Sequence, residues 1–199
     1  MTLKVTLAIT GASGMPYALK LLSELLTRAC LVNVVISKAG MLTLKQELDL
    51  TLSANVEQSR LKLIETLNLT NSGNLKLYAI ADWFAPMASG SSVDDAMVVC
   101  PCSMATLAKI ANGIGDDLIA RSADVILKER KNLIIVPRET PFSTIHLENM
   151  LRLSRLGVAI VAPIPAFYNH PKTLDDVINF IVSRILDQLG INNSLTKRW

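Results

Sequence analysis

Six short apolar runs, separated by segments with helical spacing, constrain the fold of this 199-residue chain more than any other feature. The runs are apolar on both faces, which is typical of strands in a parallel sheet that helices cover on both sides. The predicted strands are Val5–Ile9, Leu31–Ile36, Leu75–Ile80, Ala96–Cys100, Leu133–Val136 and Val158–Ala162. The pattern therefore predicts an α/β fold: one Rossmann-like domain of three layers, α/β/α, with a mainly parallel six-stranded sheet.

The composition favours an oligomer. Hydrophobic residues make up 50% of the chain, yet no run reaches the ~18 apolar residues that a membrane-spanning helix needs. We therefore expect the surplus apolar surface to be covered by further copies of the chain and not by a membrane. Residues 1–190 are predicted to form the domain. Residues 191–199 are predicted to form a tail that docks at a subunit interface, because the tail ends on an aromatic residue, Trp199.

Charge and cysteine content give no support to a nucleic-acid-binding, metal-binding or disulfide-linked protein. The net charge is only +3 and the basic residues form no stripe, so nucleic acid is not expected as a partner. The three cysteines, Cys30, Cys100 and Cys102, lack metal-ligand spacing and fit buried, reduced thiols. No signal-peptide pattern follows Met1, and we expect a cytoplasmic protein.

Polar residues follow the predicted strands where each one ends. Thr10–Gly14 follows the first strand, Ser37 the second and Arg138 the fifth. Ligands of open parallel sheets bind outside the carboxyl ends of the strands. Free amides at the start of the next helix, with the hydroxyls of Thr10 and Ser13, would make a phosphate site. The alternative is a tight turn between strand and helix with no ligand.

The stretch from Ala96 to Thr140 carries the strongest signal of an anion site. We expect its first strand to stop at Pro101 and Cys102 to open a helix. A second helix, predicted over Leu118–Leu127, carries Arg121 and is followed by Lys128. The alternative is that these two cations only pair with Asp124 and Glu129 on the helix surface.

Two other nucleotide-binding patterns are absent. The first loop lacks the third glycine of the dinucleotide fingerprint, and the chain has no Walker motif.

Three further residues are ambiguous. Trp83 lies in a long glycine- and serine-containing loop and is expected to contact a ligand or a subunit. Glu47 is either functional or a solvated charge near a helix end, and His146 is expected to be structural.

Several motifs together resemble the UbiX flavin prenyltransferase family, and the resemblance covers nearly the whole chain. The segments that carry it are Thr10–Gly14, Cys102–Ala108, Ala123–Arg130, Val136–Pro141, Ile145–Leu151 and Pro165–Tyr168. One departure is Asp117, where that family usually has Asn. The resemblance implies metal-independent transfer of a dimethylallyl group from dimethylallyl monophosphate to N5 and C6 of reduced FMN. It also implies a homododecamer with sites at subunit interfaces, and a product that UbiD-type decarboxylases use, in ubiquinone biosynthesis among other routes.

The resemblance also implies roles for individual residues. The FMN contacts would be Gly11, Ala12, Ser13, Ser37, Ser103, Met104, Ala105, Thr106 and Arg138. The donor phosphate would be bound by Tyr168, Arg184, Lys128, Arg121 and Glu139. Glu47 and Trp83 would lie near the prenyl group. The C6 proton would pass to Glu139, to Glu47 or to the released phosphate, and the sequence does not choose among the three.

Three other functions compete with this interpretation. A flavin carrier without chemistry would keep the FMN contacts but would not need the cationic residues of the donor site. A flavin-dependent decarboxylase of the cysteine type would carry an active-site histidine and a Pro-x-Met-Asn-x-x-Met-Trp segment. The chain has only His146 and His170 and no such segment. A decarboxylase acting directly on an aromatic acid would need an acid–base or redox group of its own.

Overall fold

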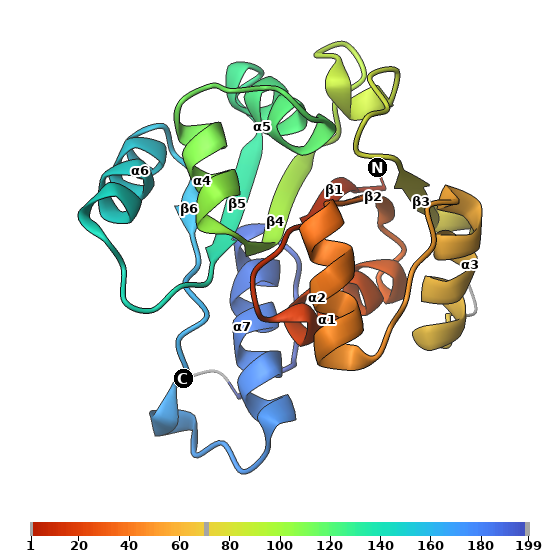
Figure 1. Ribbon diagram of the computed structural model, residues 1–199. Coiled ribbons are helices and arrows are strands. Elements are labelled where there is room, and N and C mark those ends of the chain that lie inside the picture. The colour runs from red at the N-terminus through yellow and green to blue at the C-terminus, as the bar shows by residue number, and fades with distance from the viewer. Residues whose placement is uncertain (1, 70–71, 198–199) are drawn as a thin grey trace.

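The computed structural model describes residues 2–69 and 72–197, which fold around one sheet of six parallel strands. Figure 1 shows the strand order, β3-β2-β1-β4-β5-β6. The strands are β1 (Lys4–Ile9), β2 (Leu31–Ile36), β3 (Leu75–Tyr78), β4 (Ala96–Cys102), β5 (Asn132–Pro137) and β6 (Ala159–Ile160). All neighbouring strands pair in parallel, so the predicted sheet is confirmed.

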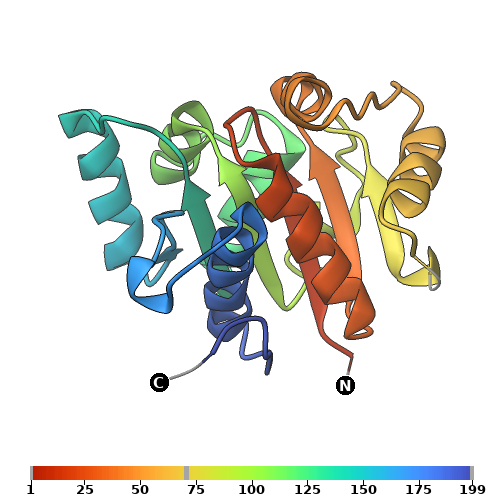
Figure 2. The same ribbon diagram turned by 90° about the horizontal axis from the view of Figure 1, so that it is seen from below.

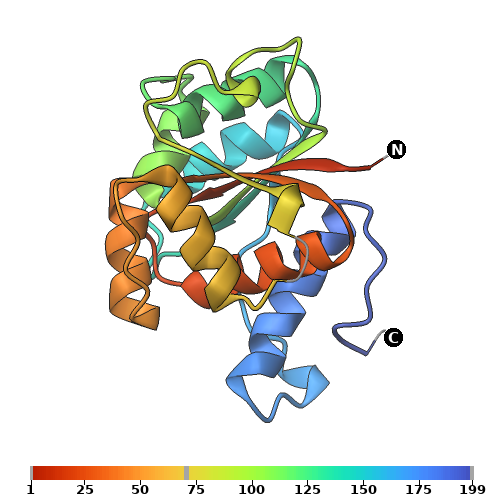
Figure 3. The same cartoon turned by 90° about the vertical axis from the view of Figure 1, so that its right-hand side faces the viewer.

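Helices cover both faces of the sheet (Figure 3), which confirms the three-layer Rossmann-like prediction. One face carries α1 (Met15–Thr27), α2 (Lys38–Leu48), α3 (Val56–Thr66) and α7 (Leu174–Gln188). The other face carries α4 (Met104–Ala111), α5 (Leu118–Lys128) and α6 (Thr144–Arg155). Figure 2 shows α1 and α7 side by side on the first face. Three single-turn helices, at Ser72–Asn74, Pro86–Ala88 and Phe167–Asn169, lie in the connections.

Side chains along each strand point alternately to the two faces of the sheet, so the hydrophobic core has two parts, one on each face. In β1, Leu7 and Ile9 pack with the α1 and α7 layer, whereas Ala8 packs with the α4 and α5 layer. All three are fully buried. Burying a side chain such as Leu7 contributes about 2 kcal/mol, so strands that are apolar on both faces require both helical layers.

The prediction that the fourth strand stops at Pro101 was wrong. β4 continues through Pro101 to Cys102, and the helix that Cys102 was expected to open begins at Met104, capped by Ser103. Proline cannot donate a ladder hydrogen bond, but the pairing of β4 with β5 is irregular between Val99 and Cys102, where Pro101 lies. The strand therefore tolerates proline. It ends two residues later than predicted, directly before the predicted flavin contacts that begin at Ser103.

The end of the described chain folds back onto its own subunit. After α7, Leu195 packs against the core on the α1 face, and Asn193 hydrogen-bonds the backbone of Ser183 in α7. Trp199, on which the expectation of a docked tail was based, lies outside the described residues. No helix in the described ranges combines the length and apolarity needed to cross a membrane.

Candidate functional site

The ends of β1 and β4 lie side by side, at the point where the strand order changes direction. Thr10 ties the two ends together: its hydroxyl donates to the Pro101 carbonyl (2.9 Å) and accepts from the Ser103 amide (2.8 Å). Its amide also donates to the Pro101 carbonyl (3.2 Å), and the residue is buried. Thr10 was expected to bind phosphate directly, but its hydroxyl is used inside the protein, so its role is to position the loops that follow both strands.

The first turn of α1 is capped from a distance. Gly14 precedes the helix with a φ of 117°, and no side chain of the first turn provides a cap. Instead Glu47, from the end of α2, accepts hydrogen bonds from the amides of Gly14 (3.0 Å) and Met15 (2.8 Å). Two amides that were predicted to bind phosphate are therefore bonded to a carboxylate. A negative group here is stabilised by the positive end of the helix dipole.

Several groups hold Glu47 in its ionised form. Burial alone would raise its pKa, but hydrogen bonds from Ser13, Met15 and Gly14 and the charge of Arg138 together hold the pKa below its ordinary value of 4.5. Glu47 is thus not the solvated helix charge of the alternative interpretation. It is an ionised carboxylate, half-buried at the carboxyl edge of the sheet.

Two more helices begin at this edge. Ser37 caps α2 by accepting from the Gly40 amide (2.9 Å), and Ser103 caps α4 by accepting from the Thr106 amide (3.3 Å). A β-carbon on Gly11 would overlap Ala39, so only glycine lets this loop approach the start of α2 so closely. The starts of α1, α2 and α4 therefore converge on one place. Glu47 already caps α1, so the positive ends of α2 and α4 are the ones that suit an anionic ligand such as the phosphate of FMN.

The end of β5 adds a cation and a second carboxylate. The Arg138 amide donates to the Cys102 carbonyl (3.3 Å), which joins the end of β5 to the end of β4, and its side chain is exposed near Glu47. Glu139 follows and accepts from the Thr140 amide (3.1 Å). We call the residues gathered here the carboxyl-edge group. Its members are Gly11, Ala12, Ser13, Ser37, Glu47, Ser103, Met104, Ala105, Thr106, Arg138 and Glu139.

A second group lies on α5 and the loop that covers it. Arg121 pairs with Asp124 (2.9 Å) and donates to the Ala88 carbonyl (3.1 Å), and Lys128 pairs with Glu129. The surface pairs of the alternative interpretation are thus present, although the bond to Ala88 also fixes Arg121 against the loop. We call Trp83, Arg121 and Lys128 the α5 group, and 48% of the Trp83 surface is exposed.

A third group lies on the opposite face of the sheet. The ring of Tyr168 meets Phe180 of α7 edge-on, with ring centres 6.4 Å apart, and Arg184 lies further along the same helix. A cavity of about 700 Å³ opens beside Tyr168. Because α5 and α7 cover different faces of one sheet, Arg121 and Arg184 are separated by that sheet within a subunit. The described chain therefore does not bring the predicted phosphate ligands together.

The remaining reactive side chains have structural surroundings. His146 accepts from the Ser143 amide (3.2 Å) and so completes the cap of α6, as expected of a structural histidine. Burial raises the pKa of both Cys100 and Cys102 far above that of an ordinary thiol, so neither is a nucleophile at neutral pH. Residues 2–69 and 72–197 contain no group of three or more His, Cys, Asp or Glu that could hold a metal ion.

Two features were not predicted from the sequence: the hydrogen bonds of Thr10 that join the ends of β1 and β4, and the cap that Glu47 forms on α1. Both join residues far apart in the chain, 91 or more residues for Thr10 and 32 or more for Glu47. One signal was available. The start of α1 has no Ser, Thr, Asp or Asn at its cap position and no acidic residue in its first turn. The free backbone amides at the buried start of such a helix need a hydrogen-bond acceptor, which must then come from a distant part of the chain.

Comparisons with known proteins show the family of this chain and support its fold. The family model described as Flavoprotein matches residues 1–186. A flavin prenyltransferase UbiX from Methanocaldococcus jannaschii is 50% identical and covers 99% of this chain and 98% of its own length. A dodecameric FMN-dependent UbiX-like decarboxylase from Escherichia coli O157:H7 superposes with a TM-score of 0.87 at 41% identity, over 99% of both chains. The AnUbiX protein, solved with FMN and dimethylallyl pyrophosphate, gives 0.88 at 38% identity, over 100% of this chain and 98% of its own.

Proposed function

The chain belongs to the flavoprotein family and, within it, to the UbiX flavin prenyltransferases, and on this premise we propose that it transfers a dimethylallyl group from dimethylallyl monophosphate to N5 and C6 of reduced FMN. The observation that carries the proposal is the carboxyl-edge group, where three helix starts and Arg138 face one place. The product would serve UbiD-type decarboxylases. The three described cysteines are all unpaired, which suits the cytoplasm that we propose as its location.

FMN would bind at the carboxyl edge. The flavin phosphate is suited to the starts of α2 and α4 and to Arg138, because these offer amides, hydroxyls and a cation together. Reduced FMN would supply the two atoms that receive the dimethylallyl group. Ser13 and the ionised carboxylate of Glu47 lie at the same edge, where they can orient the ring and hold a proton.

The donor phosphate would be bound by cations and a hydroxyl. Breaking the allylic carbon–oxygen bond leaves a phosphate anion, and Arg121, Lys128 and Arg184 can bind it with charge-assisted hydrogen bonds. Tyr168 can donate one more hydrogen bond. Each such preorganised donor contributes roughly 3 kcal/mol to a transition state. Trp83 can stabilise the allyl cation through its ring face, by about 2 kcal/mol in a dry site.

The positions of these residues support a site that is shared between subunits. Arg121 lies on one face of the sheet and Arg184 on the other, so one phosphate can be reached by both only if they come from different copies. Large apolar side chains are exposed on both faces, among them Phe84 (99%) and Phe167 (76%). The solved relative named as dodecameric supports an oligomer of this kind. We therefore propose a homo-oligomer, a dodecamer, with each site completed between copies.

A direct test is anaerobic incubation with reduced FMN and dimethylallyl monophosphate, followed by mass spectrometry of the released flavin. The expected product is heavier by one dimethylallyl unit. A parallel reaction with the pyrophosphate identifies the preferred donor, because the AnUbiX complex contains that compound. Unmodified flavin that stays tightly bound with both donors would contradict the proposal and favour the carrier alternative.

A decarboxylase is the second candidate, because the Escherichia coli structure carries that name. It predicts release of CO₂ from an aromatic acid with FMN alone. We expect no CO₂ in that reaction unless a separate decarboxylase is added after flavin modification. Release of CO₂ by this protein alone would favour the second candidate.

Single substitutions separate donor binding from flavin binding. Tyr168→Phe and Arg184→Ala are expected to reduce turnover by about 100-fold while FMN affinity changes little, because each removes one donor to the leaving phosphate. Steady-state kinetics and flavin fluorescence titration measure the two effects. An equal loss of FMN affinity would show that these residues bind the flavin.

A further inference from the structure

Arg184 is held by an acidic neighbour on its own helix. Its Nη1 atom lies 2.7 Å from Oδ2 of Asp187, less than one turn further along α7. The Arg184 side chain is 52% exposed, whereas that of Asp187 is only 16% exposed. An exposed ion pair of this spacing does little by itself to fix a long arginine, because the side chain loses rotamer freedom for a screened attraction.

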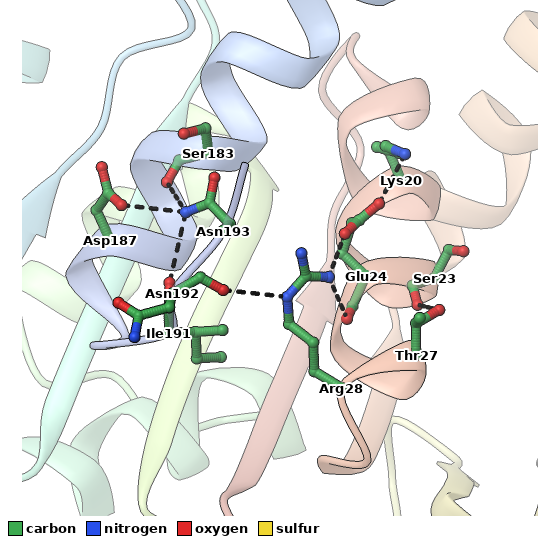
Figure 4. A network of polar contacts seen from close by, with 10 residues as sticks. All are labelled: Lys20, Ser23, Glu24, Thr27, Arg28, Ser183, Asp187, Ile191, Asn192 and Asn193. Carbon is green, nitrogen blue, oxygen red and sulfur yellow. Dashed lines mark hydrogen bonds and ion pairs between the residues drawn. The ribbon is translucent and has the colours of Figure 1, made fainter. Parts of the chain in front are cut away.

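Asp187 is in turn held by the chain that follows the helix (Figure 4). Its other oxygen, Oδ1, accepts a hydrogen bond from the side-chain amide of Asn193 (3.1 Å). The same amide nitrogen lies 3.4 Å from the carbonyls of Ser183 and Ile191. Gly190, with a φ of 71°, provides the turn that brings Asn193 back onto α7.

This segment is also attached to α1. The carbonyl of Asn192 lies 3.4 Å from Nε of Arg28, and Arg28 pairs with Glu24, which pairs with Lys20 (2.7 Å). Figure 4 shows the two sets of contacts side by side, one on α7 and one on α1. The carboxylate of Asp187 is therefore fixed relative to the body of the subunit and not only to its own helix.

We propose that Asp187 and Asn193 are positioning residues that aim the Arg184 guanidinium at the phosphate of the prenyl donor in a neighbouring copy. This inference rests on the proposed function, in which Arg184 binds that phosphate. Asp187 takes one edge of the guanidinium, at Nη1. The planar group has donors on its other edge as well, and these can bind two phosphate oxygens. The carboxylate also weakens the net positive charge, so the benefit to donor binding is one of geometry.

The first test is Asp187→Asn, which removes the ion pair and keeps the size of the side chain. We expect the KM for dimethylallyl monophosphate to rise about tenfold, with kcat changed less than about threefold, because one hydrogen bond to a charged group is lost. FMN affinity is expected to stay the same. Asn193→Ala should change KM in the same direction by about threefold, as expected for a neutral hydrogen bond. Asp187→Glu should restore part of the loss.

Asp175→Asn is the matched control, since it removes an exposed carboxylate from the same helix, and we expect an unchanged KM. Light scattering and thermal unfolding check that each variant assembles and folds. If Asp187→Asn fails to assemble, Asn193→Ala provides the test. An unchanged KM in an assembled Asn193→Ala variant would then overturn the proposal.

A double-substitution cycle separates this proposal from the assignment on which it rests. In the Arg184→Ala background, Asp187→Asn should change the donor KM no further, because Asp187 acts through Arg184. A full additional effect would overturn the positioning role. A defect in Arg184→Ala combined with a normal Asp187→Asn variant would overturn the positioning role alone. A normal donor KM together with normal turnover in Arg184→Ala would overturn the donor-site assignment and the proposal with it.

Discussion

The two ends of the sheet use carboxylates in opposite ways. At the amino end, Asp94 is 2% exposed and accepts hydrogen bonds from the side chains of Thr6 (2.6 Å) and Asn33 (2.8 Å). At the carboxyl end, Glu47 is half-buried and accepts from two backbone amides at the start of α1. Asp94 joins three neighbouring segments inside the fold, whereas Glu47 lies where ligands can reach it. The difference suggests that one end stabilises the fold and the other carries the chemistry.

The largest effect is expected from Glu47→Gln. Turnover should fall by about 100-fold or more if Glu47 has the proposed role of orienting the flavin ring and holding a proton there. The free energy of unfolding should fall by only about 1 kcal/mol, since glutamine can still accept one hydrogen bond at the start of α1. Single-turnover kinetics and denaturant unfolding measure the two quantities.

Asp49→Asn provides the control for Glu47→Gln, because Asp49 ends the same helix with a φ of 51°, a conformation that asparagine also tolerates. Both quantities should stay unchanged in that control. Normal turnover by Glu47→Gln would show that Glu47 has no catalytic role, and would contradict the proposed difference between Glu47 and Asp94.

The opposite result is expected from Asp94→Ala. The free energy of unfolding should fall by about 3 kcal/mol, because Thr6 and Asn33 lose their buried partner. Turnover per folded enzyme should not change. Asp95→Ala is the control, since Asp95 is exposed and accepts from the amide of Lys4 (2.9 Å), and it should cost about 1 kcal/mol or less. A catalytic defect in Asp94→Ala without loss of stability would reverse the assignment of the two ends.

Acid should act on the carboxyl end through Glu47. Its pKa is below the ordinary value of 4.5 because hydrogen bonds and Arg138 outweigh burial. The unfolded chain therefore binds the proton more readily, so this stabilisation is present above pH 4.5 and is lost as the pH falls through the lower folded value. Below pH 4.5 the wild type should lose stability more steeply than Glu47→Gln. Parallel curves for the two proteins would show that the carboxylate is not stabilised by these contacts.

The smallest effect is expected from Asp117→Asn, at the one position noted above where the sequence departs from its resemblance to the UbiX family. Asp117 caps α5 through the Ala120 amide (2.9 Å) and contacts Lys109 (3.2 Å). Asparagine caps a helix equally well, and Lys109 keeps its pair with Asp116 (2.8 Å), so stability should change by less than about 0.5 kcal/mol. A larger loss of stability, measured by thermal unfolding, would show that the ion pair between Asp117 and Lys109 stabilises the fold.

Much of the fold and part of the site could be predicted because they depend on local patterns. The apolar runs predicted the strands, and the position of Ser37 and Arg138 just after strands predicted that they lie at one edge. Periodicity and strand ends are properties of neighbouring residues, and parallel pairing then aligns them.

The remaining features depend on contacts between distant segments. Nothing near Glu47 indicates that it caps a helix 32 residues earlier, and nothing near Thr10 indicates that its hydroxyl bonds β4. The strand order was also unknown from sequence. Without it, the sequence could not show that Arg121 and Arg184 lie on opposite faces of the sheet.

A site formed at the carboxyl edge of one copy and completed by other copies can be tested by mixing subunits. Arg121→Ala and Arg184→Ala chains, each expected to be strongly impaired alone, are co-expressed and the mixed oligomers are purified through two different tags. If the two arginines of one site come from different copies, roughly a quarter of the sites receive both, and about that fraction of wild-type turnover should return. Turnover no higher than that of the separate variants would show that both arginines of a site belong to the same chain, and would contradict the shared site.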